Sequence, residues 1–179
     1  MKAVIDTNVI LVANNQHKDV SGPCVLRCID RLTKAMNDTV VVIDDGYRIL
    51  GEYQNKTSLS PPKGVGDVFL KWLLRNAGNE RFVEQVALSE HPQHFFREFP
   101  CPGLEPWFDP PDRKFAATAN AHVDKPCILQ AADCKWLDWW QELHDAGVTV
   151  DFICPDDACR FYKKKFPLKV QPPLPELAR

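Results

Sequence analysis

The sequence predicts an α/β protein with three layers, in which helices cover both faces of a central, mostly parallel sheet. Short runs of apolar and β-branched residues recur along the chain, and they are apolar on both faces, as in buried parallel strands. Segments whose apolar residues follow helical spacing lie between these runs. Strands that alternate with helices from one end of the chain to the other predict such a sheet.

The first half of the chain opens with a strand, a helix and a second strand. Ser21 suits the N-cap of the helix, and Pro23 lies in its first turn. The pair Pro61-Pro62 separates two further helical patterns. The expected elements are a strand over 2–5, a helix over 21–36, a strand over 39–43, a helix from 45 to before Pro61 and a helix over 64–78, and residues 82–88 fit either a strand or a helix.

The second half begins with a long connection from Pro92 to Pro111 that is rich in proline and aromatic residues. Irregular connections of this length are often functional. Asp112 opens a clear helix, because an acid suits the first turn and the alanines that follow suit a packed face. Beyond the connection we expect a helix over 112–121, a strand over 127–129, a helix over 136–144 that stops at Gly147, and a strand over 148–153.

Length and composition favour a single domain, since 179 residues suit one core. We expect this domain over residues 1–162, with an extended helical and loop insertion at about 56–108, and a Lys/Pro-rich extended tail over 163–179. A net charge of −2 excludes nucleic-acid binding by bulk charge. No apolar run is long enough for a membrane span and no secretory-signal pattern is visible, so a cytoplasmic protein with no membrane contact is expected.

The cysteines predict no disulfide framework, because their number is odd and they are scattered through the expected helices and strands. No CxxC pair occurs, and the closest spacings lack a second half with zinc-ligand spacing. We therefore expect reduced thiols and no structural zinc. The seven residues are Cys24, Cys28, Cys101, Cys127, Cys134, Cys154 and Cys159.

Four carboxylates stand at the ends of periodic segments. Asp6 ends the first strand, at the edge where open α/β sheets build their sites. Carboxylates gathered at one edge repel each other, so such a cluster usually holds divalent metal. The four expected catalytic and metal-binding residues are Asp6 as the central ligand, with Glu52, Asp112 and Asp133, and the expected cofactor is one or two ions of Mg²⁺ or Mn²⁺. Taken singly, each acid also fits a helix cap or an exposed charge.

These acids lie in segments that resemble, in the same order, the motifs of PIN-domain nucleases. The segments are Val4-Ile5-Asp6-Thr7-Asn8-Val9, Ile49-Leu50-Gly51-Glu52-Tyr53, the run from Asp109 to Ala117, and Ile128-Leu129-Gln130-Ala131-Ala132-Asp133. The resemblance spans residues 3 to about 155 and implies a PIN-like fold. It also implies a metal-dependent endoribonuclease, a hydrolase that cuts single-stranded RNA and leaves 5′-phosphate and 3′-hydroxyl ends.

Further polar residues near the four acids have expected supporting roles. Asn8 or Thr7 would bond to Asp6 or touch phosphate, Asp109 could reach the site from its loop, and Asp138 could partly substitute for a missing ligand. Arg113, Lys114 and Lys135 are the basic residues expected to contact substrate. The densest basic run, Lys163 to Lys165, fits a solvated face better than an RNA-binding one.

Two alternatives stay open at this point. One is an inactive PIN-like scaffold that binds RNA or a protein partner, and it is favoured by Ala131 and Lys135, which stand where the family often has a hydroxyl and an acid. The other is a toxin neutralised by an antitoxin, or the nuclease of a host-defence assembly. The expected partners are therefore RNA, with single-stranded DNA as a variant, an antitoxin or another protein inhibitor, and a second copy of the chain in a homodimer.

Overall fold

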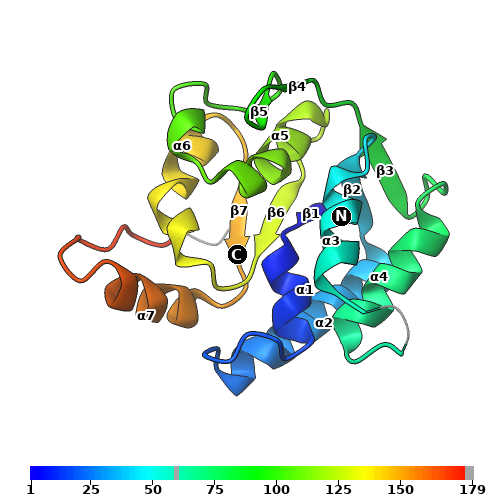
Figure 1. Ribbon diagram of the computed structural model, residues 1–179, viewed down its shortest axis with the longest axis horizontal. Helices are drawn as coiled ribbons and strands as arrows, with labels where there is room; N and C mark the ends of the chain where they lie inside the picture. Colours follow the sequence, from blue (N-terminus) through cyan, green and yellow to red (C-terminus); the bar gives the residue numbers. More distant parts are fainter. Residues whose placement is uncertain (59–60, 176–179) are drawn as a thin grey trace.

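The computed structural model describes residues 1–58 and 61–175, and in it five parallel strands form one central sheet (Figure 1). The strand order is β3-β2-β1-β6-β7. The strands are β1 Lys2–Ile5, β2 Val40–Asp44, β3 Val83–Val86, β6 Cys127–Gln130 and β7 Val150–Phe152. All four pairings between neighbouring strands are parallel. The predicted α/β class with a parallel central sheet is thereby confirmed.

Strand β1 lies at the centre of the sheet because it is apolar on both faces. Ala3 pairs with Val41 on one side and with Cys127 on the other. Val4 and Ile5 are fully buried, so helices must cover both faces. Because β1 and β6 are parallel neighbours, their carboxyl ends lie at the same edge of the sheet, although the two strands are far apart in the sequence.

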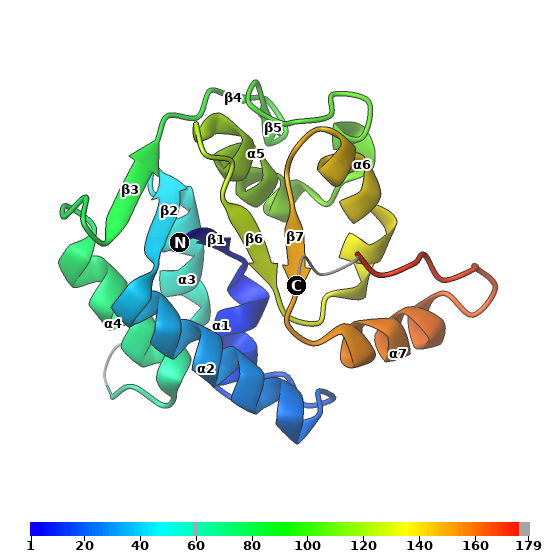
Figure 2. The same cartoon turned by 180° about the vertical axis from the view of Figure 1, so that it is seen from behind.

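Helices surround the sheet, as Figures 1 and 2 show from opposite sides. The part of the chain that the structure describes contains seven α-helices. Helices α1, α2 and α4 pack against one another, and α5 lies on β1, β2 and β6. Ser21 caps α2 by accepting a hydrogen bond from the backbone N–H of Cys24, as the sequence predicts. The helices are α1 Thr7–Ala13, α2 Gly22–Asp38, α3 Arg48–Lys56, α4 Val65–Asn76, α5 Arg113–Ala121, α6 Trp140–Asp145 and α7 Pro155–Lys165.

The segment expected as an insertion at about 56–108 contributes to the main fold. It supplies β3, the edge strand of the central sheet, and helix α4. The proline-rich connection is also less irregular than expected. It contains a small antiparallel hairpin, β4 Glu90–His91 with β5 Phe95–Phe96, and two short 3-10 turns. A further 3-10 turn over Cys134–Asp138 precedes α6, where the sequence predicts one continuous helix.

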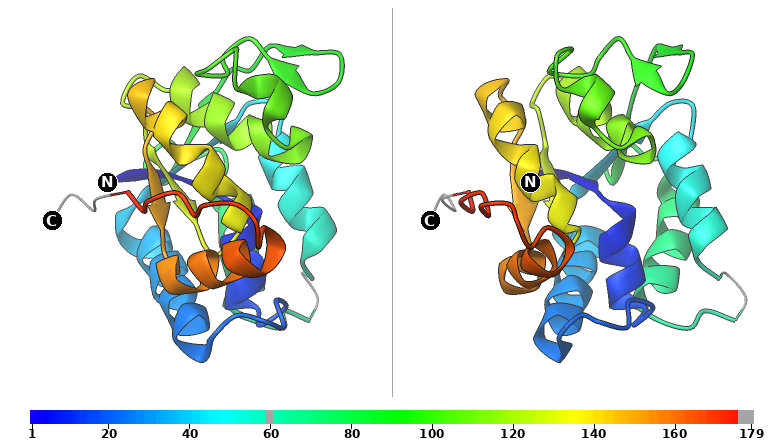
Figure 3. Two further views of the ribbon diagram at one scale, coloured as in Figure 1. Left: turned by 90° about the vertical axis from the view of Figure 1, so that its left-hand side faces the viewer. Right: turned by 60° about the vertical axis from the view of Figure 1, so that its left-hand side comes forward.

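Residue 162, where we expect the domain to end, lies inside α7 Pro155–Lys165. Two acids in the first turn of α7 and three lysines in its last turn match the helix dipole, so Lys163 to Lys165 are helical. The following segment runs past α6 and α7 (Figure 3), where Pro173 accepts a hydrogen bond from the indole of Trp140. Residues 176–179 of the expected tail lie outside the described residues.

Two of the seven cysteines are joined, which corrects the expectation of seven reduced thiols. Cys24 in the first turn of α2 and Cys154 at the N-cap of α7 form a disulfide, with their Cα atoms 5.3 Å apart. The remaining five cysteines are free. The packing of α2 beside α7 creates this pair, and neither cysteine has a sequence pattern that predicts it.

No helix among residues 1–58 and 61–175 combines the length and the apolar character that crossing a membrane requires.

Candidate active site

Asp6 leaves the carboxyl end of β1 and begins α1. Its side chain is buried, with 4% exposed, and it accepts a 2.7 Å hydrogen bond from the backbone N–H of Asn8. Asp6 is therefore the N-cap of α1. A helix cap is one of the roles that this acid, taken singly, fits in the sequence. The pKa of Asp6 is raised to about 7, chiefly by burial and to a smaller extent by the nearby carboxylates of Asp133 and Glu52.

Asp112 and Asp133 approach Asp6 from α5 and β6. Burial is the largest cause that raises the pKa of Asp112, to about 8, and the charges of Asp6 and Asp133 add to it. Asp112 stands at the N-cap position of α5 but accepts no capping hydrogen bond there within the part of the chain that the structure describes. Asp133 caps the 3-10 turn instead, and burial raises its pKa as well. The carboxylates of Asp6, Asp112 and Asp133 thus lie in one region that is largely shielded from water.

Glu52 reaches the same place from α3, whose start is fixed by Asp44. The fully buried carboxylate of Asp44 accepts hydrogen bonds of 2.9 Å from the backbone N–H groups of Arg48 and Ile49. The hydroxyl of Tyr53, next to Glu52, donates to the backbone oxygen of Ile5 in β1. Helix α3 is therefore attached directly to the strand that carries Asp6.

The basic residues expected to contact substrate have partners inside the protein instead. Lys114 pairs with Glu52 and also donates to the backbone oxygen of Pro111. Lys135 pairs with Asp109, and Arg113 donates to the backbone oxygens of Phe108 and Gln93. Lys114 consequently supplies positive charge within the acidic cluster, and it lowers the pKa of Asp6 relative to burial alone.

Of the residues expected to support the four acids, Asn8 links two segments of the cluster, whereas Asp138 makes its contacts elsewhere. Asn8 accepts a 3.2 Å hydrogen bond from the backbone N–H of Ala132 and so links the segment of Asp6 to that of Asp133. The hydroxyl of Thr7 is buried and has no hydrogen-bond partner in the described residues. Asp138 instead faces α7, where it accepts from the hydroxyl of Tyr162 at 2.5 Å. Asp138 therefore does not join the cluster.

The four acids fit a hard divalent cation that keeps much of its water. Their oxygens are the donors that Mg²⁺ and Mn²⁺ prefer, and the raised pKa values show that positive charge would be favourable there. Among the described residues, however, the one group of three or more possible ligands whose atoms all lie within 4.8 Å of one another is a cysteine cluster. The four acids do not form such a close group within the described residues, so an ion bound there would be held by few carboxylates, with waters completing its shell.

Two cavities each include one of the four acids in their wall. One has a volume of about 310 Å³ and is lined by Arg48, Glu52 and Lys114 among others. The other has a volume of about 510 Å³, and its wall combines Asp133 and Asn8 with cationic and aromatic side chains. These additional side chains are His17, Phe161, Lys164 and Lys165.

Sequence reasoning missed this second cavity. Its lysines belong to the densest basic run of the chain. This run is the feature of the sequence that could have indicated the cavity, but a run of charges by itself favours a solvated helix face. The ring of His17 stacks on Phe161 with 5.4 Å between ring centroids. Residues 144 positions apart are thereby brought to the edge of the acidic cluster, and no local pattern predicts that contact.

Comparisons with protein-family models, with curated proteins and with solved structures find no significant match.

Proposed function

We propose that the protein is a metal-dependent endonuclease that cuts single-stranded RNA. The observation that carries the proposal is the convergence of Asp6, Asp112 and Asp133, whose pKa values are all raised by burial, beside Glu52; repulsion from neighbouring carboxylates adds to the shift of Asp6 and of Asp112. Perturbed carboxylates beside a cavity are typical of catalytic sites.

Bound Mg²⁺ or Mn²⁺ would supply an activated water and would neutralise charge on the phosphate. Asp6 would hold the ion together with Asp112 or Asp133, since the charge of Asp133 raises the pKa of Asp6 and the charges of Asp6 and Asp133 raise that of Asp112. The ion pair with Lys114 fixes the orientation of Glu52 and limits the negative charge of the site. The backbone N–H of Asn8 donates to Oδ1 of Asp6, so Oδ2 would be the oxygen available to hold an ion.

The two cavities support a chain-like substrate. A strand that crosses the acids would enter both cavities, and the lysines of α7 would meet its phosphates. Local cations are required because the net charge of the protein is −2. The stacked pair of His17 and Phe161 offers an aromatic surface of the kind that contacts unpaired bases.

An inactive scaffold that binds RNA or a protein partner is the second candidate, and specific contacts favour it. Lys114 neutralises Glu52, and Lys135 neutralises Asp109, so two acids already have a positive partner. An antitoxin, a host-defence assembly and a homodimer remain predictions from the resemblance.

Incubation with end-labelled single-stranded RNA tests the first candidate. Cleavage is expected with Mn²⁺ or Mg²⁺, to stop with EDTA, and to return when excess Mn²⁺ is added. Asp145→Asn serves as the control, because Asp145 is exposed on α6 and should leave cleavage unchanged. Absence of EDTA-sensitive cleavage, together with no rise in Tm when Mn²⁺ is added, would contradict the proposal and favour the scaffold.

The larger cavity gives a second prediction. Lys165→Glu is expected to raise KM for RNA about tenfold and to weaken its dependence on salt, with little change in kcat, because a phosphate contact is replaced by a repulsive charge. Lys163→Glu is the matched control, since Lys163 lies in the same turn of α7 but outside the wall of the cavity. Equal effects of the two substitutions would show that only the overall charge of α7 matters.

A further inference from the structure

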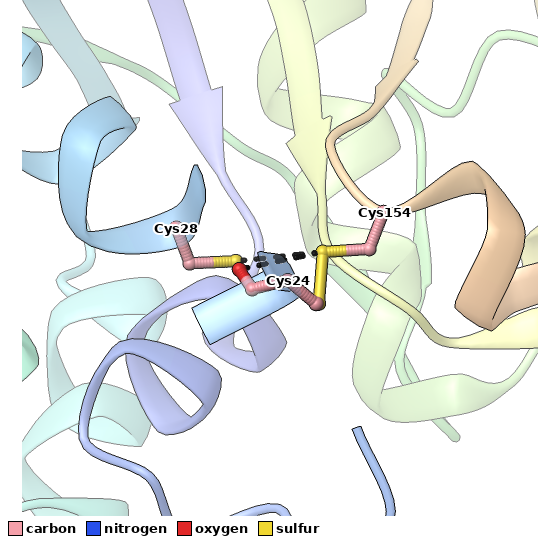
Figure 4. A group of neighbouring side chains, drawn as sticks. All are labelled: Cys24, Cys28 and Cys154. Carbon is pink, nitrogen blue, oxygen red and sulfur yellow. Dashed lines mark hydrogen bonds between the residues drawn. A yellow bond between two sulfur atoms is a disulfide. The ribbon is translucent and has the colours of Figure 1, made fainter. Parts of the chain in front are cut away.

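Three sulfur atoms meet where the start of α2 packs against the turn between β7 and α7 (Figure 4). Cys24 and Cys28 lie one turn apart on the same face of α2, and Cys154 stands at the N-cap of α7. Their exposed fractions are 1%, 0% and 1%. All three Sγ atoms lie within 4.8 Å of one another.

The disulfide between Cys24 and Cys154 leaves Cys28 as a buried free thiol beside it. The Sγ atoms of Cys28 and Cys154 are 3.9 Å apart. Two thiolates bound to one tetrahedral zinc at about 2.3 Å each stand roughly 3.8 Å apart. Cys28 and Cys154 therefore already have about the separation of two ligands of one ion.

The donor set selects the class of ion. Sulfur is the only ligand type in the group, and thiolates prefer soft cations such as Zn²⁺ to Mg²⁺ or Mn²⁺. Arg31 lies close enough to lower the pKa of Cys28, so its positive charge would partly offset the negative charge of three thiolates. Burial is the larger influence and raises the pKa of Cys28 to about 12, so this thiol keeps its proton until a cation displaces it.

We propose that the protein, once its disulfide is reduced, binds one thiophilic cation of the zinc class through Cys24, Cys28 and Cys154. A phosphine can supply the two electrons. The S–S bond breaks, phosphorus takes the oxygen of one water molecule to become a phosphine oxide, and the two protons of that water go to Cys24 and Cys154. The cation then displaces the protons of all three thiols. The sequence expectation of no structural zinc is replaced by this proposal, since Cys154 is brought to the other two by folding.

The site is independent of the proposed nuclease, but it shares a structural element with it. The disulfide in one redox state and the cation in the other would each fasten α7 to α2. Helix α7 carries the lysines of the larger cavity. Both states would therefore hold these lysines near Asp133.

Titration with Cd²⁺, a spectroscopic substitute for Zn²⁺, tests the proposal. The full chain is reduced with a phosphine, and alkylation with mass spectrometry verifies that all seven cysteines are free. Sulfur-to-cadmium charge-transfer absorption is expected to saturate at one equivalent and to disappear when excess Zn²⁺ competes. The unreduced protein should show no such saturation, because two of the three ligands are joined.

Cys28→Ser provides the decisive variant, since it keeps the disulfide and should fold as the parent does. Its reduced form is expected to lose at least about tenfold in Cd²⁺ affinity, whereas Cys159→Ser, which removes a free thiol outside the cluster, should bind normally. Equal affinity of the Cys28→Ser variant and the parent, or no saturable absorption in the reduced parent, would overturn the proposal.

Discussion

Replacing Cys24 and Cys154 together by alanine is expected to lower the free energy of unfolding by about 4 kcal/mol. The bond joins residues that are 130 positions apart, so it restricts the unfolded chain strongly. Both side chains are almost completely buried, and alanine leaves no unpaired polar group in their place. The fold should survive, because the sheet and its covering helices do not depend on the bond for their hydrogen bonds.

Urea denaturation in metal-free buffer measures this difference. Cys159→Ala is the control, because it removes a half-buried thiol without changing the disulfide, and a loss below about 1 kcal/mol is expected. Reduction of the parent should bring its midpoint towards that of the double variant. Seven free thiols in the unreduced parent, or a double variant as stable as the control, would show that the bond is absent or contributes nothing.

Asp6→Asn is expected to stabilise the metal-free protein at pH 8 by about 3 kcal/mol while it strongly reduces cleavage. The pKa of Asp6 is raised from 3.8 to about 7 in the folded protein. Its contribution to stability is complete below about pH 4, falls as the pH rises towards 7, and stays low above that, because the folded state then holds a buried charge. Asparagine removes this charge, and its side-chain oxygen can still accept the capping hydrogen bond from Asn8.

Denaturation in EDTA at pH 5 and pH 8 separates this effect from others. The parent should lose stability between the two pH values, and Asp6→Asn should lose less, although Asp112 retains a raised pKa of its own. With Mn²⁺ the order reverses, since the parent gains stability by binding and the variant does not. Cleavage by the variant should fall about a thousandfold. A variant that is less stable than the parent at pH 8, or that cleaves RNA at the parental rate, contradicts the assignment.

The elements that sequence reasoning predicted correctly have local causes. Strand β1, strand β2 and helix α2 follow from apolar runs and from the cap at Ser21, and none requires a distant partner. Helix α7 was missed because its proline and charged residues resemble an extended tail. The disulfide was missed because only the packing of α2 beside α7 brings Cys24 to Cys154.

The same distinction applies to the candidate site. Asp6 and Asp133 could be expected to converge because parallel strands end at one edge of a sheet, and the structure brings Glu52 of α3 and Asp112 at the start of α5 to the same place. The ion pairs of Lys114 and Lys135 could not be predicted. They depend on the turns that start α5 and follow β6, and both lysines consequently face acids rather than solvent.

The position of β1 between β2 and β6 also sets the order in which the molecule can be assembled. The backbone N–H of Asp6 donates to the backbone oxygen of Leu129, and Ala3 of β1 pairs with Cys127 of β6. These partners are far apart in the sequence. Such long-range pairing is slow, and during synthesis it must wait until β6 has left the ribosome. A nascent chain that ends before β6 holds Asp6 and Glu52 without Asp133, so the acidic cluster can be completed only after β6 has been synthesised and has paired with β1.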